Sequence, residues 1–236
     1  MIKENLAQVH ERINAACARC GRTPDKITLV SVSKTKPFSM IEECIAAGEH
    51  VFGENYVQEL CEKYAQCQSD SITWHMIGHL QRNKVKYIID KAALIHSVDS
   101  LRLAAQIESE AAKRELIMNI LLEVNIAEEE SKWGFTADET KAAVRQIATE
   151  FPHVRVRGLM TSAPYTEDPE SNRPHFRRLH ALFTDIQTHP PKDASGQPVC
   201  FDTLSMGMTG DYEVAIEEGA TMIRVGTGIF GERSYL

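Results

Sequence analysis

The chain has 236 residues, of which 43% are hydrophobic and 25% charged, and its formal net charge is −7. These values are typical of a soluble globular protein, and the negative charge argues against nucleic-acid binding through bulk electrostatics. The six cysteines lack a disulfide framework, the N-terminus lacks an apolar signal-peptide core, and no stretch approaches the roughly 20 apolar residues of a membrane span, so we expect a cytoplasmic protein.

The chain alternates between amphipathic segments and short apolar, β-branched runs. At the N-terminus, Ile2, Leu6, Val9, Ile13 and Cys17 fall at helical spacing and predict a helix with one buried face. The apolar runs that follow predict strands at 27–33, 50–54, 73–78, 93–97, 117–125, 154–160, 201–206 and 221–226. The segments between them predict helices at 38–48, 56–68, 81–90, 100–114, 137–150, 172–188 and 211–218.

This order of elements predicts an α/β fold with a parallel sheet. Several apolar runs lack period-two alternation, as expected for parallel strands buried on both faces. Eight strands with seven intervening helices correspond to a (β/α)8 TIM barrel, with the extra N-terminal helix docked on its outside. An open doubly wound sheet is the alternative, and the even spacing of the eight units favours closure. No long linker or low-complexity tract divides the chain, so we expect residues 1–236 to form a single domain.

In such barrels the active site lies at the C-terminal ends of the strands. The first predicted strand runs into Lys34, and strand alternation places this lysine on the same side as Val32. A lysine amine held in an apolar setting is a good Schiff-base nucleophile for an aldehyde. A solvated loop lysine is the alternative, which the apolar run before Lys34 disfavours. Lys36 falls in the loop that follows.

The last two strands end in turns of small residues. The segment 204–211 contains two glycines and two hydroxyl residues before a predicted helix, and the segment 223–228 forms a second glycine turn. Free backbone N–H groups in such turns bind phosphate, and this fold often has a phosphate site after strands 7 and 8. A lysine beside a phosphate site fits pyridoxal 5′-phosphate. It fits equally well a cofactor-free Schiff-base aldolase that acts on a sugar phosphate.

Two further patterns suggest metal binding only weakly. Cys17 and Cys20 form a CxxC pair without a second pair, and they share a helix face with Ile13, which favours core packing. His75 and His79 lie four residues apart but lack the glutamate of an HExxH motif. We therefore expect no metal site.

Several longer motifs occur in a fixed order along nearly the whole chain. They are 20–22 (CGR), 32–37 (VSKTKP), 52–59 (FGENYVQE), 74–84 (WHMIGHLQRNK), 158–160 (GLM), 204–208 (LSMGM) and 224–231 (RVGTGIFG). In this combination the sequence resembles the YggS/PROSC family of pyridoxal phosphate-binding proteins, also called pyridoxal phosphate homeostasis proteins. That family looks like the N-terminal barrel of alanine racemase standing by itself.

The resemblance implies roles for residues around the mouth of the barrel. Lys34 would carry the cofactor as a Schiff base, and Arg224 would face the pyridine nitrogen. Asn55 would lie near the lysine and the ring. Met160 is a candidate to pack on the ring face, with core filling as an equally good alternative.

The resemblance also implies how the phosphate is held. The residues concerned are Ser205, Gly226 and Thr227, with the backbone of Met206, Gly207 and Thr209 beside them. Where the family often has serine and an acidic pair, this chain has Thr209-Gly210-Asp211. The threonine keeps the hydroxyl group.

The same comparison predicts binding rather than turnover. An arginine facing the pyridine nitrogen disfavours its protonation, which makes the ring a weaker electron sink. Racemisation also needs a second acid/base group, which racemases obtain from an additional domain and a partner subunit. A chain of this length has no such domain, and nothing in the spacing of Tyr165 assigns it that role.

We therefore expect a monomeric carrier or buffer of pyridoxal phosphate, not an enzyme. It would act in intracellular cofactor homeostasis and affect amino-acid metabolism indirectly. Pyridoxal phosphate-dependent apoenzymes would be its acceptors, and no nucleic acid or membrane would be a partner. Lys36 could assist exchange by transimination. A racemase-like enzyme acting on amino acids is the alternative.

Overall fold

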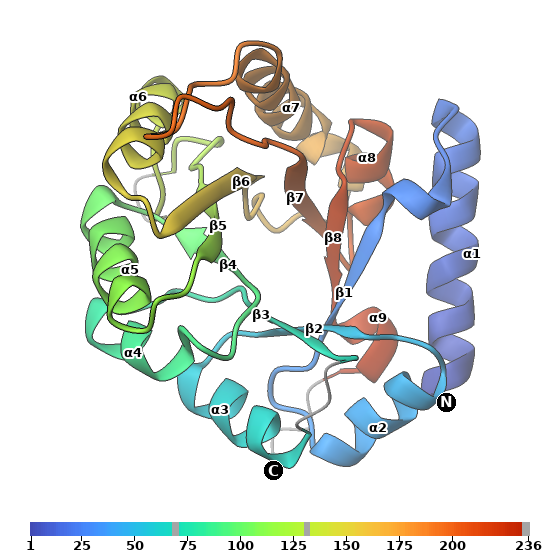
Figure 1. The fold of residues 1–236 in the computed structure, drawn as a ribbon. Coiled ribbons are helices and arrows are strands. Elements are labelled where there is room, and N and C mark those ends of the chain that lie inside the picture. Colours follow the sequence, from blue (N-terminus) through green and yellow to red (C-terminus); the bar gives the residue numbers. More distant parts are fainter. Residues whose placement is uncertain (68–70, 130–132, 233–236) are drawn as a thin grey trace.

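The computed structural model describes residues 1–67, 71–129 and 133–232. Eight parallel strands form a closed barrel in sequence order, because β1 pairs with both β2 and β8 (Figure 1). The strands are β1 (Thr28–Val32), β2 (Val51–Glu54), β3 (Thr73–Met76), β4 (Leu94–Val98), β5 (Met118–Glu123), β6 (Val154–Met160), β7 (Thr203–Met208) and β8 (Met222–Val225). The closure confirms the predicted (β/α)8 barrel and excludes the open sheet.

Helices surround the barrel (Figure 1). They are α1 (Ile2–Cys20), α2 (Phe38–Ala46), α3 (Val57–Gln66), α4 (Val85–Ile88), α5 (Leu101–Lys113), α6 (Ala137–Glu150), α7 (Arg173–Thr188), α8 (Tyr212–Glu217) and α9 (Thr227–Phe230). Short 3-10 turns are η1 (Pro24–Lys26), η2 (Arg82–Lys84) and η3 (Pro169–Asn172). The helix predicted at 81–90 therefore begins as η2, and α9 was not predicted. Gln68, the last residue of the helix predicted at 56–68, lies outside the described residues.

Two strands differ from their predicted bounds in ways that affect the site. β1 ends at Val32, so Lys34 lies beyond the strand. β7 begins at Thr203, two residues later than predicted, because Phe201 leaves the sheet to pack on Phe183 with 5.2 Å between ring centroids. β7 also ends at Met208, two residues later than predicted, so Gly207 and Met208 lie in the strand.

The apolar residues form two cores. A small cluster fills the barrel interior and consists of Val30, Leu94, Leu121, Met160 and Met222. A much larger core lies between the sheet and the helices, and all five residues predicted for the buried face of α1 belong to it. All five residues of β4 are buried, which accounts for the absence of alternation in its sequence.

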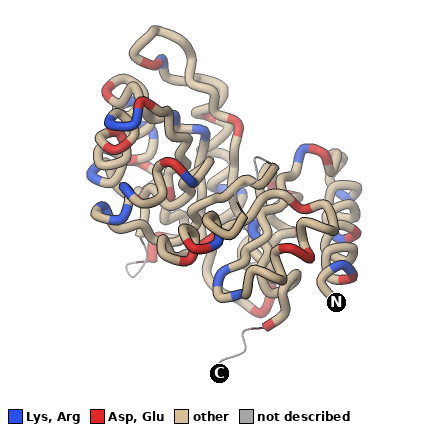
Figure 2. Tube along the Cα trace, turned by 60° about the horizontal axis from the view of Figure 1, so that its bottom comes forward, with Lys and Arg blue, Asp and Glu red and all other residues tan. Residues whose placement is uncertain are grey.

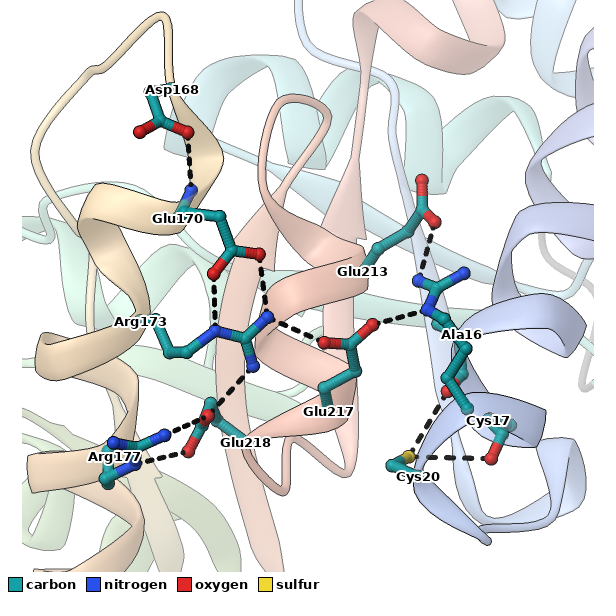
Figure 3. Close-up of polar contacts among 11 residues, drawn as sticks. Ala16, Cys17, Cys20, Asp168, Glu170, Arg173, Arg177, Glu213, Glu217 and Glu218 are labelled. Atoms are coloured by element: carbon teal, nitrogen blue, oxygen red, sulfur yellow. Dashed lines mark hydrogen bonds and ion pairs between the residues drawn. The ribbon is translucent and has the colours of Figure 1, made fainter.

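An ion-pair network joins α8 to α1 and α7 (Figure 3). Arg173 on α7 donates to Glu170, to Glu217 at 2.7 Å and to Glu218 at 2.9 Å. Arg19 on α1 donates to Glu217 at 2.6 Å from the other side. Through these contacts the short helix that follows β7 is held between α1 and α7.

The charged residues are otherwise distributed without a dominant sign. Lys and Arg positions are interleaved with Asp and Glu positions along the tube in Figure 2. Among the helices of the described segments, none has both the length and the apolar character needed to cross a bilayer.

Candidate functional site

Lys34 lies in a tight turn directly after β1. The N–H of Ser33 still donates to Gly53 O of β2 at 3.1 Å, the N–H of Lys36 donates to Ser33 O at 3.1 Å, and Thr35 has a φ of 64°. Lys34 therefore lies in the turn and not in the strand whose alternation the sequence argument used. The turn nevertheless lies at the C-terminal end of β1, and Lys34 is half-buried there.

A buried lysine on α3 holds this turn in place. Lys63 is 5% exposed, and its Nζ donates to Ser33 O at 2.7 Å, Glu54 Oε1 at 2.8 Å and Glu59 Oε1 at 2.7 Å. Glu59 Oε1 also accepts the backbone N–H of Thr35 at 2.5 Å. The residues on both sides of Lys34 are thus bound to one cluster of charges.

Glu54, at the end of β2, is the fully buried member of this cluster. Its Oε1 also accepts the hydroxyl proton of Ser33 at 2.5 Å, while its Oε2 has no hydrogen-bond partner. Burial raises the pKa of Glu54 to about 7, against the opposing effects of Lys63 and the Ser33 hydroxyl. Removal of Lys63 would leave this carboxylate without its countercharge.

The turns after β7 and β8 meet beside the Lys34 turn. The N–H groups of Gly226 and Gly228 donate to Thr209 Oγ1 at 3.3 and 3.4 Å. A Cβ placed on Gly226 would lie 3.4 Å from Val32 O, so the β8 turn contacts the end of β1. Two backbone donors and one hydroxyl therefore converge next to a lysine, as a phosphate with an attached aldehyde would require.

Arg224 extends from β8 across the barrel interior and is 4% exposed. Its Nη1 donates to Ser205 Oγ at 2.7 Å, and its Nη2 donates to Thr161 O at 2.9 Å. Ser205 Oγ is also hydrogen-bonded to His96 Nδ1 at 3.0 Å, and His96 Nε2 is hydrogen-bonded to His75 Nδ1 at 3.0 Å. Arg224, Ser205, His96 and His75 therefore form one continuous chain of hydrogen bonds.

Burial determines the charges along this chain. It lowers the pKa of His75 to about 4, and it lowers the pKa of His96 well below its usual value with help from His75 and Arg224. Both imidazoles are neutral near pH 7. Burial also lowers the pKa of Arg224, to about 10, so the guanidinium stays charged. Its two hydrogen-bond acceptors are neutral, so among the described residues the cation is held without a direct ion pair.

The other predicted site residues occupy different depths. Ser205 and Met206 are fully buried in β7, and the Ser205 hydroxyl is bound inside the barrel. Met160 is 1% exposed within the interior cluster, as expected of a side chain that fills the core. Asn55 is half-buried directly after β2, and Thr227 is exposed as the first residue of α9.

Gly207 lies in β7, where it packs closely against α8. Its φ is 92°, and an added Cβ would lie 2.5 Å from Ala215 Cβ and 2.9 Å from Tyr212 Cα. We expect Gly207→Ala to lower the free energy of unfolding by about 2–4 kcal/mol, since both overpacking and the left-handed backbone are unfavourable. Urea denaturation measures the effect. Gly210→Ala is the control, because nothing lies within 4 Å of its Cβ position. An equal loss in both variants would contradict the packing argument.

Sequence reasoning missed Lys63, His96 and Thr161. One signal was available, since His96 is a polar residue inside the apolar run 93–97. The CxxC pair was interpreted as packing residues, and the structure agrees. Cys17 is fully buried, and Cys20 Sγ contacts the carbonyl oxygens of Ala16 and Cys17 (Figure 3). Within residues 1–67, 71–129 and 133–232, no three His, Cys, Asp or Glu side chains are grouped to hold a metal ion.

Comparisons with known proteins relate this geometry to a family. The family model "Alanine racemase, N-terminal domain" matches residues 4–234. A relative from Aquifex aeolicus (strain VF5), named pyridoxal phosphate homeostasis protein, is 44% identical over 98% of both chains. A protein of the same name from Escherichia coli (strain K12) is 40% identical over 99% of this chain and 97% of its own. The chain belongs to the pyridoxal phosphate homeostasis protein family.

Solved structures agree with this assignment. The chain is similar to PipY of Synechococcus elongatus PCC7942 with PLP bound, at a TM-score of 0.82 and 31% identity, over 98% of this chain and all of that one. Alanine racemase from Clostridium difficile 630 shares the fold at a TM-score of 0.71 and 13% identity, with 98% of this chain covering 56% of that one. As a family member, the chain thus has the barrel fold expected from the sequence.

Proposed function

We propose that this family member binds pyridoxal 5′-phosphate covalently through Lys34 and acts as a carrier or buffer in cofactor homeostasis. The observation that carries the proposal is the convergence of the Lys34 turn with the Gly226 and Gly228 N–H groups and the Thr209 hydroxyl. When bound, the cofactor supplies an aldehyde that reacts reversibly with primary amines. The names of the relatives and the PLP bound to PipY support the same assignment.

The residues around the site have separate tasks in this proposal. Gly226, Gly228 and Thr209 would hold the phosphate, with Thr227 and the backbone of Met206 and Gly207 beside them. Arg224 would present a fixed cation toward the pyridine nitrogen and so keep a proton off it. Ser205 would then act on Arg224 rather than on the phosphate. Asn55 would border the ring.

Two features support a carrier over a racemase-like enzyme, and a third concerns how a carrier would exchange its cofactor. Arg224 keeps its positive charge, which disfavours the protonated ring that stabilises carbanions best. Tyr165, the tyrosine considered as a second acid/base, is 95% exposed on the loop after β6. Lys36 Nζ donates to Gly231 O at 3.1 Å and to Glu232 O at 2.8 Å, so exchange through Lys36 would first break these contacts. We further propose a monomeric single domain in the cytoplasm that delivers the cofactor to apoenzymes.

Borohydride reduction tests the covalent site. After incubation with excess pyridoxal phosphate, reduction and peptide mapping should give a phosphopyridoxyl adduct on the peptide that contains Lys34. Lys34→Ala should lose the adduct. Lys36→Ala should retain it, because Lys36 is bound to the end of α9. A protein that forms no adduct unless a sugar phosphate is added would instead be an aldolase, and this result would overturn the proposal.

A second measurement separates carrier from enzyme. The loaded protein is mixed with amino acids in heavy water, and exchange of the α-proton is followed by NMR. A carrier should exchange no faster than free pyridoxal phosphate at the same concentration. Exchange well above that background, lost in Lys34→Ala, would establish the racemase-like alternative.

A further inference from the structure

A cavity opens at the mouth of the barrel, away from the turns that contain Lys34, Thr209 and Gly226. Its volume is about 770 Å³, and it lies between the segments that follow β3, β4 and β5. Residues 79–83, the start of α5 and residues 133–134 line it. None of the residues proposed to hold pyridoxal phosphate is among them. The volume falls within the range of small-molecule sites.

One wall of the cavity is a fixed aromatic surface. The Trp133 ring stacks on the His79 ring with 4.7 Å between centroids and 24° between planes, yet Trp133 remains 63% exposed. His79 Nδ1 lies 3.3 Å from Asp99 Oδ2, and Ser100 Oγ donates to Asp99 Oδ1 at 3.0 Å. An indole ring supported from behind and open in front is a suitable surface for stacking a planar ring.

The same cavity contains two uncommitted cations. Arg82 and Arg102 line it and are exposed, and neither makes an ion pair with any carboxylate in the described part of the chain. The acidic group of the lining, Asp99, is already bound to His79 and Ser100. Arg173, in contrast, forms ion pairs with three glutamates. Guanidinium groups bind phosphate through paired hydrogen bonds.

The floor of the cavity is apolar. Leu80 and Leu103 line it and are 2% and 1% exposed. A ligand that satisfies all three surfaces carries a planar ring and a dianionic group. We propose that this cavity is a second, non-covalent binding site for a planar heteroaromatic monophosphate, with its ring on Trp133 and its phosphate on Arg82 and Arg102. The inference does not depend on Lys34 or on the carrier function.

The chain provides its own probe for this site. It has two tryptophans, and the other one, Trp74, is 2% exposed in the core, so a ligand in the cavity changes the fluorescence of Trp133. The protein as purified is titrated with adenosine 5′-monophosphate and with pyridoxine 5′-phosphate, which has no aldehyde to react with Lys34. We expect a saturable fluorescence change with at least one of them, and the one that binds identifies the ligand as a nucleotide or a pyridine phosphate.

Matched variants locate the binding. Arg82→Gln with Arg102→Gln should weaken binding at least about tenfold, since the charge-assisted hydrogen bonds are lost. Arg145→Gln with Arg155→Gln removes the same charge from exposed positions outside the cavity and should leave the affinity unchanged. Lys34→Ala should also bind normally, and calorimetry should show weaker binding to Trp133→Leu.

Three results would overturn the proposal. The first is no saturable change with either compound. The second is an affinity that survives the loss of both Arg82 and Arg102. The third is binding that disappears in Lys34→Ala, which would assign the signal to the Lys34 site.

Discussion

Lys63→Met is expected to lower the free energy of unfolding by about 3–5 kcal/mol, the range for breaking a buried ion pair from one side. Lys63 Nζ is the donor to Ser33 O, Glu54 and Glu59, and its loss leaves the fully buried Glu54 without a partner charge. Urea denaturation followed by circular dichroism measures the change. The variant should also form the Lys34 adduct more slowly, because the turn on which Lys34 lies loses its support.

Two controls separate the buried charge from lysine removal in general. Lys141→Met breaks an ion pair with Asp185 in which both side chains are about half-exposed, and it should change stability by about 0–1 kcal/mol. Lys63→Met combined with Glu54→Gln should recover part of the loss, since no unpaired charge remains at the bottom of the cluster. If Lys141→Met cost as much as Lys63→Met, the buried cluster would have no special importance.

The barrel interior should make the protein sensitive to acid. His75 has a pKa of about 4 in the folded protein and an ordinary value of 6.5 once unfolded. Between these two values the unfolded chain binds a proton that the folded chain does not. Stability conferred by neutral His75 is therefore complete above pH 6.5 and is lost as the pH falls toward 4, by roughly 1.4 kcal/mol per pH unit and about 3 kcal/mol in total.

Denaturation at several pH values between about 7.5 and 4.5 tests this dependence. His75→Asn keeps a polar side chain that can hydrogen-bond to His96 Nε2, and it should reduce the slope by about one proton. Burial also lowers the pKa of His96, so part of the pH dependence should remain in His75→Asn. His189→Asn, at a side chain that is 79% exposed, is the control for histidine removal in general. An unchanged slope in His75→Asn would show that His75 does not titrate as its burial implies.

The barrel could be predicted from the sequence because its signals are local. The helix 137–150 and the strand 154–160 were predicted with the bounds of α6 and β6. Thr136 and Glu139 form a capping box at the start of α6, and apolar residues at helical spacing follow. Lys34, Thr209 and Gly226 could be found for a similar reason, since each follows an apolar run and the fold brings such positions to one end.

The parts that could not be predicted depend on contacts between distant segments. The Ser205 hydroxyl accepts from Arg224 on the neighbouring strand, a contact that no local pattern in the sequence indicates. Lys63 looks like an ordinary polar helix residue, and only the packing of α3 against β2 turns it inward to Glu54. No spacing rule in the sequence distinguishes these side chains from solvent-exposed ones.

The seam between β1 and β8 has a consequence for biosynthesis. Lys34 and the Gly226 turn directly follow the first and last strands, and the Lys36 contact with Gly231 spans 195 residues. During translation the N-terminal strand must wait for β8 to leave the ribosome before the ring can close. Under the proposed function, nascent or truncated chains lack the complete pocket. Loading with cofactor would then select finished barrels and stabilise them by mass action, so that binding acts as a test of complete folding.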